Sequence, residues 1–198
     1  GGGLWKSTDG GNSWSTNTDN LPVIGVSYIA INPTNPQEMY ITTGDAHASD
    51  TYSIGILKSI DGGVTWDTTG IQFPVPSNKM VNKLLIHPTH TDSLFAATDE
   101  RIMISPDGGQ SWSVAQNSSG SNLIGRFRDI EFKPNNPNVL YAVKQTTGSS
   151  EVFKSTDRGL SWFSSSNGIS IVNRNRPLIA VTPANPDAVY VLFCKNDY

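Results

Sequence analysis

The sequence predicts an all-β fold, a β-propeller assembled from four-stranded antiparallel blades. Two motifs alternate along the chain, and each occurs four times at intervals of about 50 residues, a period typical of propeller blades. The composition agrees, because 18 glycines and 12 prolines in 198 residues suit many short strands joined by tight turns. Long helical patterns are missing from the chain.

The first motif predicts a tight turn between two strands and reads "STDGGNSW" in its first copy. Its Asp can accept hydrogen bonds from the amides that follow, its Gly permits a positive φ, and its Ser offers a hydroxyl. Its Trp can cover the turn and donate the indole N–H to a carbonyl. Because turn capping explains the repetition, we expect a structural role for these carboxylates and not acid catalysis or metal binding. The motif residues are Ser7, Asp9, Gly11 and Trp14; Ser59, Asp61, Gly63 and Trp66; Ser105, Asp107, Gly109 and Trp112; and Ser155, Asp157, Gly159 and Trp162.

The second motif predicts a buried strand that ends at a proline turn, with copies aligned on Pro33, Pro88, Pro134 and Pro183. Apolar residues lie two and four positions before each proline, which marks one face of a strand, and most positions between them are small or apolar too. Each proline cannot donate to a ladder and ends its strand, and a second apolar strand follows. We label the strands of a repeat A and B, around the proline turn, and C and D, around the Asp turn. A parallel arrangement of the four strands is not expected, because no connection is long or helical enough for a crossover.

The order of motifs also predicts the division into blades. The chain begins at a C strand and ends just past a B strand. Propellers close with about four to eight blades, so we expect a segment covering about four blade-equivalents of a larger propeller, with the remaining blades of the same polypeptide as its neighbours. A segment would also account for the missing leader peptide. The expected parts are a half blade at 1–20, blades at 21–70, 71–117 and 118–167, and a half blade at 168–198.

Charge and cysteine content exclude several classes of function. Lys and Arg total 14 against 17 Asp and Glu, a formal net charge of −3, which argues against nucleic acid as a partner. No apolar run approaches the roughly 18 residues of a membrane span. The single cysteine, Cys194, excludes an internal disulfide and is expected to be buried in an apolar strand. We expect no cofactor and no metal: His87 and His90 have no third ligand nearby and are expected to face solvent.

The spacing S-x-D-x-G-x-[ST]-W resembles the Asp-box of the BNR repeat, although Arg158 replaces a neighbouring glycine in the fourth copy. Asp-boxes occur in sialidases, xyloglucan-degrading glycoside hydrolases, sortilin-type receptors, photosystem-assembly propellers and large secreted bacterial proteins. Together with the "PxNPxxxY" pattern, the chain looks most like the sortilin-like and xyloglucanase-like branch, and like secreted proteins of gliding bacteria, which use type IX secretion. The resemblance implies a secreted or cell-surface location, in a bacterium.

The strand order predicts where a ligand would bind. The A–B and C–D turns share one face of a propeller, and the less repetitive B–C and D–A loops share the other. We expect the loop face to bind a protein or a glycan, with the arginines clamping a carboxylate or a sugar. The other reading is that these are solvated loop charges that pair locally. The candidates are Asp45, His47, Asp50, Tyr52, Phe73, Arg126, Arg128, Arg174 and Arg176.

Three functions are weighed on this basis. The main prediction is a non-catalytic binding propeller of an exported protein. The first alternative is part of a polysaccharide-acting glycoside hydrolase, in which "YITTGDAHASD" lies where xyloglucanase-like enzymes carry a catalytic Asp, making Asp45 the best candidate. No partner carboxylate is evident, and "NRNRPLIA" resembles the first arginine segment of sialidases only superficially. The second alternative is an assembly-factor propeller for a membrane complex.

Overall fold

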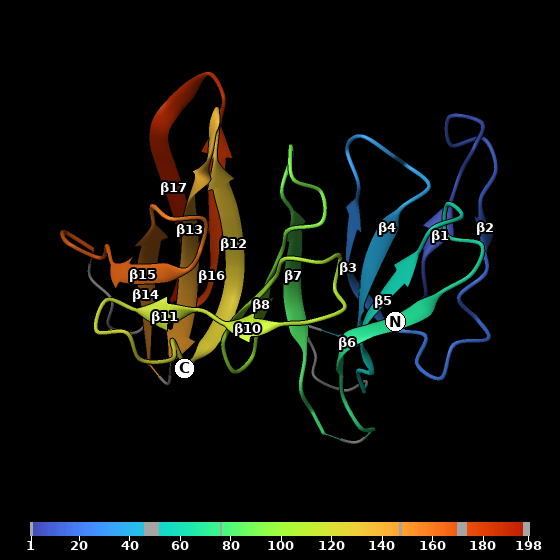
Figure 1. Cartoon of the computed structure of the whole chain (residues 1–198), viewed down its shortest axis with the longest axis horizontal. Helices are drawn as coiled ribbons and strands as arrows, with labels where there is room; N and C mark the ends of the chain where they lie inside the picture. The colour runs from blue at the N-terminus through green and yellow to red at the C-terminus, as the bar shows by residue number, and fades with distance from the viewer. Residues whose placement is uncertain (1, 46–51, 76, 147, 170–173, 196–198) are drawn as a thin grey trace. The chain divides into compact units, whose positions relative to one another are not determined.

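The computed structural model describes residues 2–45, 52–75, 77–146, 148–169 and 174–195, and all of their regular elements are β-strands (Figure 1). Two compact units, 1–81 and 82–198, divide the chain, and each is described by itself. Within the described ranges, no helix has the length and hydropathy to cross a membrane.

The first unit holds a two-stranded sheet and a four-stranded antiparallel sheet whose strands follow chain order. The inner strand β3 ends at Ile31, before Pro33, because proline cannot extend the ladder. Its neighbour β4 is buried along its whole length, with Tyr40 and Ile41 fully inaccessible. The strands are β1 (Trp5–Lys6) and β2 (Ser15–Thr16), then β3 (Val26–Ile31), β4 (Met39–Thr43), β5 (Gly55–Ser59) and β6 (Asp67–Gln72).

The second unit repeats this pattern twice and adds a two-stranded sheet. The inner strands again end just before prolines 88, 134 and 183. The first sheet runs β7 (Val81–Ile86), β8 (Leu94–Thr98), β9 (Ile102–Ser105) and β10 (Ser113–Val114). The next holds β12 (Arg126–Lys133), β13 (Asn136–Thr146), β14 (Ser149–Ser155) and β15 (Ser161–Ser164), and the last pairs β16 (Arg174–Thr182) with β17 (Asn185–Lys195).

One short strand adds a parallel pairing to the antiparallel sheets. After β10 the chain continues into β11 (Gln116–Asn117), which runs parallel to β15, and Gln116 N donates to Leu160 O at 2.9 Å. The chain between them, which includes β12, β13 and β14, makes the long connection that a parallel pair requires. The segment covers the outer edge of the next sheet, an edge that would otherwise present unpaired backbone groups.

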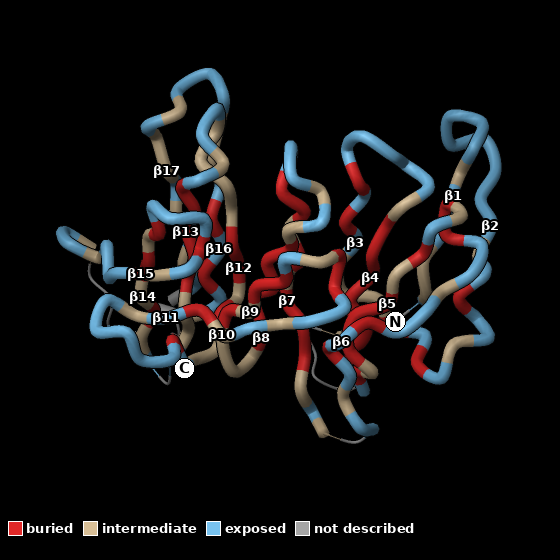
Figure 2. The backbone as a smooth tube through the Cα atoms, in the orientation of Figure 1, coloured by how far each residue is buried: buried red, intermediate tan, exposed pale blue. Residues whose placement is uncertain are grey.

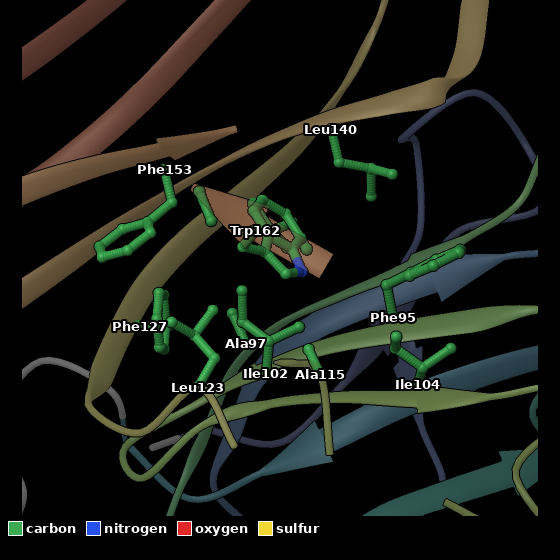
Figure 3. Close-up of a cluster of buried hydrophobic side chains, with 12 residues drawn as sticks. Phe95, Ala97, Ile102, Ile104, Ala115, Leu123, Phe127, Leu140, Phe153 and Trp162 are labelled. Atoms are coloured by element: carbon green, nitrogen blue, oxygen red, sulfur yellow. The ribbon is translucent and has the colours of Figure 1, made fainter. Parts of the chain in front are cut away.

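The core of the second unit lies between successive sheets. Phe95 and Ile102 from one sheet pack against Phe127, Leu140 and Trp162 of the next, all at most 1% exposed (Figure 3). Burial is concentrated in the strands, and the turns are exposed (Figure 2). The ring of Trp162 therefore fills the gap beside the preceding sheet of this unit.

A buried ion network also joins three inner strands. Lys83 Nζ on β7 lies 2.7 Å from Asp129 Oδ1 and 2.6 Å from Glu131 Oε1 on β12. The other oxygen, Asp129 Oδ2, accepts a hydrogen bond of 2.8 Å from Ile179 N on β16. Burial acts to lower the pKa of Lys83, but the charges and hydrogen bonds of Asp129 and Glu131 together outweigh it, so this pKa is raised. The network therefore favours the charged lysine and ties the strands together.

Two burial expectations are wrong. Cys194 is exposed and not buried, because it shares one face of β17 with Tyr190 and Leu192, which are 61% and 60% exposed. Alternation along a strand puts these three side chains on the same face. The apolar side chains of the inner strands are also not all buried, since Ile31 and Leu178 are about half exposed, at 50% and 48%.

Candidate functional site

The four Asp-box turns share one hydrogen-bond pattern, which the third copy illustrates. Gly109 N donates to Ser105 Oγ at 2.9 Å, and Ser111 N donates to Asp107 Oδ1 at 2.9 Å. Ser111 Oγ donates to the second carboxylate oxygen at 2.5 Å, and Trp112 Nε1 donates to Gly109 O at 3.0 Å. Both carboxylate oxygens are therefore occupied by the turn itself, which is what the box sequence requires of a cap.

These hydrogen bonds favour the ionised carboxylates. The side-chain hydroxyl and backbone amide of Ser13 are the main causes that lower the pKa of Asp9 to about 2, and Ser111 does the same for Asp107, also to about 2. The pKa of Asp61 is lowered by Thr65 in the same way. Burial opposes the shift at Asp157, yet hydrogen bonds from its own turn still lower that pKa. A carboxylate of this kind is a poor proton donor at neutral pH.

The second box differs at its tryptophan. In the other three copies the indole N–H donates to the glycine carbonyl, but here Asn17 Nδ2 donates to Gly63 O. Trp66 Nε1 is buried and has no partner among the described residues. Lys6 Nζ donates to the adjacent Gly62 O at 2.8 Å. The side chains of Lys6 and Asn17 therefore hydrogen-bond to the backbone carbonyls of Gly62 and Gly63 in this turn.

The Asp turn of each complete sheet is joined to the proline turn of the same sheet. Gly62 N donates to Gln37 O at 2.9 Å, and Gly108 N donates to Asp92 O at 2.8 Å. In the fourth box Arg158 N makes the equivalent bond, and Arg158 takes the left-handed φ of +57° that glycine has elsewhere. Both turn types therefore lie at one end of the sheets, as the strand order predicts, and the variable loops lie at the other.

His87 is not the solvent-facing residue that we expected, since it is only 2% exposed. Its Nδ1 accepts from Thr89 N at 3.3 Å and from His90 N at 3.1 Å. In the first repeat Asn32 Oδ1 accepts from two amides of its own turn in the same way. Burial, followed by the charge of His90, lowers the pKa of His87. The imidazole is a turn cap, and the described residues contain no group of three metal-ligating side chains.

At the loop end of the first unit, three candidates lie within the described residues. Asp45 follows β4 and is half-buried, with a polar partner of its own. Tyr52 precedes β5 and is 48% exposed, and Phe73 follows β6 and is half-buried. His47 and Asp50 lie outside the described residues. The three described residues flank the B–C and D–A loops, and whether they bind a ligand stays a prediction.

At the loop end of the second unit, the structure places charged groups together. Arg126 Nε lies 2.9 Å from Asp99 Oδ1, and the same oxygen accepts a hydrogen bond of 2.9 Å from Asn82 Nδ2. Burial lowers the pKa of Arg128, and the charge of Arg126 lowers it further; Arg176 acts in the same direction, whereas Asp99 opposes it. Arg126 and Arg128 therefore lie within electrostatic reach of Asp99, and Arg176 lies within electrostatic reach of Arg128. Of Arg174 only the backbone, which pairs with Lys195, is described.

Asp99 and Asn82 are members of this group that sequence reasoning missed. Asp99 directly follows the B strand β8, at the position that Gly44 occupies after β4. It was missed because the short B–C turn that contains it has no conspicuous sequence pattern. Asn82 occupies the position six residues before Pro88, where Arg128 stands relative to Pro134. Aligning the repeats on their prolines at this inner position would have grouped Asn82 with Arg128.

Sequence comparison finds xyloglucanases and sortilin-like receptors. An oligoxyloglucan-reducing end-specific xyloglucanase of Emericella nidulans is 27% identical over 183 residues, covering 80% of this chain and 22% of the relative. A xyloglucanase of a Paenibacillus species is 27% identical over 192 residues, covering 81% and 18%. The human VPS10 domain-containing receptor SorCS3 is 30% identical over 113 residues, covering 56% and 8%. The chain thus spans about a fifth of the length of the two xyloglucanases, and no protein-family model matches it.

Solved structures show a similar fold. An ancestral GH74 enzyme superposes with a TM-score of 0.73 at 24% identity, covering 98% of this chain and 25% of that enzyme. The GH74 enzyme of Niastella koreensis gives 0.69 at 23% identity, covering 97% and 30%. At these identities the likeness shows the fold alone, and it confirms an all-β, propeller-type fold. The resemblance to xyloglucanase-like and sortilin-like propellers is likewise confirmed. The blade boundaries stay a prediction.

Proposed function

We propose that this chain is a propeller segment of an exported glycoside hydrolase that acts on xyloglucan or a similar polysaccharide. The observation that carries the proposal is the similarity to xyloglucanases over about four-fifths of the chain, against 56% for the sortilin-like receptor. This difference favours the hydrolase over the non-catalytic binding propeller that the sequence led us to expect. The glycan would contact the loop face, and further blades of the same polypeptide would complete the enzyme.

Asp45 is the proposed catalytic carboxylate of this segment. It lies two residues past the end of the buried strand β4, and its side chain is half-buried, so it remains partly accessible to substrate. Glycoside hydrolysis uses two carboxyl groups, about 5–5.5 Å apart in retaining enzymes and about 6.5–9.5 Å apart in inverting ones. The partner of Asp45 would come from another loop of the same face. The Asp-box carboxylates are unsuited to this role, because their oxygens are taken up by their own turns.

The test uses the full product of the gene that encodes this chain. Purified protein is incubated with xyloglucan, and new reducing ends are counted over time. We expect cleavage, and we expect Asp45→Asn to lower the rate by about 10²–10⁴-fold, the usual worth of a positioned acid or base. Asp67→Asn, a matched change on the exposed start of β6, should leave the rate unchanged. Binding of xyloglucan with no cleavage would contradict the proposal and restore the binding propeller.

A further inference from the structure

Two neighbouring inner strands carry an arginine at a β-bulge. The ladder of β12 shifts between Phe127 and Asp129, which leaves Arg128 outside the register. The ladder of β16 shifts between Asn175 and Leu178, and Arg176 there takes a φ of +46°. A bulge re-aims a side chain, and a left-handed non-glycine residue stores strain that is concentrated at functional sites. Both bulges lie at the loop end of their strands.

At the inner position of Arg128, six residues before the proline of the repeat, two other repeats carry a much smaller side chain. Ser27 in β3 contacts Val81 O at 3.2 Å, and Asn82 in β7 donates to Phe127 O at 2.8 Å. One donor to the next strand is therefore enough for the structure. Arginine brings five N–H donors and a permanent charge to this position, more than the single donor that the contact with the next strand requires.

The cluster carries an excess of positive charge. Arg126, Arg128 and Arg176 contribute three cations, and Asp99 contributes one carboxylate, which gives a net charge of +2 for this group. Arg126 is partly exposed at 38% of its side chain, and Arg176 is exposed. Holding like charges together costs free energy that a bound anion recovers.

Two nearby ion pairs, one that follows Asp99 in the sequence and one on β13 and β14, do not neutralise the cluster. Glu100 and Arg101 form an ion pair of 3.2 Å, and Lys144 and Glu151 form one of 2.5 Å, so each pair adds no net charge.

We propose that Arg126, Arg128 and Arg176 bind the carboxylate of an acidic sugar within the polysaccharide. This inference rests on the proposed glycan-acting function and adds a substrate class to it, because xyloglucan-like recognition alone would not require a cationic cluster. A guanidinium presents two parallel donors that match a carboxylate, so arginine suits this ligand better than lysine does.

The experiment measures binding of a hexamer of galacturonic acid to the full gene product by calorimetry, with the methyl-esterified hexamer as the uncharged form. We expect the acid to bind at least tenfold more tightly than the ester, and the difference to shrink as salt is raised. Arg176→Gln should weaken binding of the acid by about tenfold or more, since the side chain is exposed and its loss spares the core. Lys133→Gln, at the opposite end of β12, removes the same charge and should leave binding unchanged.

Three results would overturn the inference. They are equal affinity for acid and ester, no effect of Arg176→Gln in protein whose unfolding midpoint is unchanged, and binding of a poly-glutamate peptide as tight as that of the hexamer. The last result would mean that the cluster docks an acidic protein segment. Cleavage of xyloglucan is scored separately, so acid binding without cleavage refutes the proposed hydrolase, and cleavage without acid binding refutes only the present inference.

Discussion

Asp129→Asn tests how much the buried network stabilises the second unit. Asp129 is 4% exposed, and both of its oxygens accept hydrogen bonds: Oδ1 from Lys83 and Ile130 N at 2.7 and 2.9 Å, and Oδ2 from Ile179 N at 2.8 Å. An amide has one oxygen, so either orientation points an NH₂ group at a donor. One buried N–H without an acceptor costs about 1–3 kcal/mol, and the lost charge on the lysine bond adds about 1–2 kcal/mol.

The expected loss in the free energy of unfolding is therefore about 2–4 kcal/mol, because the upper ends of the two contributions, about 3 and about 2 kcal/mol, are not reached together in one orientation of the amide. It stays below the roughly 3–5 kcal/mol of a fully stranded buried charge, because Lys83 keeps Glu131 at 2.6 Å. At about 2–4 °C per kcal/mol, the unfolding midpoint should fall by roughly 5–15 °C. Urea titrations measure the free energy, and an unchanged slope shows that the denatured state is the same.

The matched control is Asp187→Asn, which makes the same chemical change. Asp187 pairs with Lys133 but is 86% exposed, so water replaces the lost interaction and stability should hardly change. If Asp129→Asn costs no more than this control, the network does not tie the inner strands together and the reasoning fails.

Two further predictions concern single positions. His87→Asn should keep the turn cap, because Asn32 caps the equivalent turn in the first repeat. The pKa of His87 is lower in the folded protein than in the unfolded chain, so His87 makes the free energy of unfolding fall as the pH drops below about 6.5 and through the folded pKa. The variant lacks this titrating group and should therefore show a smaller fall. Unfolding at pH 7.5 and 5 checks this, and an unchanged pH slope would refute it. Gly55→Ala should cost at least about 1 kcal/mol more than Gly120→Ala, because both have a positive φ but a Cβ at Gly55 overlaps the Ile71 carbonyl, whereas at Gly120 it meets nothing. Equal unfolding free energies would count against this packing.

Local chemistry made the fold predictable. Pro33 and its three counterparts end strands for a reason contained in one residue, and each box holds its turn with side chains at most four positions from its Asp. The parallel strand β11 and the exposure of Cys194 depend instead on which sheet edge or face is covered, and that is set by other repeats.

The candidate site was predictable only in part, for the same reason. Arg126 and Arg128 are conspicuous in the sequence, but their shared carboxylate lies 27 positions from Arg126 and enters from a different sheet. His87 could not be recognised as a cap because histidine rarely replaces asparagine in such turns; its role depends on a buried ring nitrogen facing two amides. Asp45 remains a prediction that activity must decide.

The central claim is that the box carboxylates hold turns and do no chemistry. Carboxyl-detected NMR titration of the protein tests this most directly, with single Asp→Asn variants to assign the signals. The account predicts that Asp9 and Asp107 titrate with pKa values of about 2 and that Asp61 and Asp157 titrate below the ordinary value of 3.8. Values at or above 4 for these groups would contradict it, because such carboxylates would not be held by the hydrogen bonds of their turns.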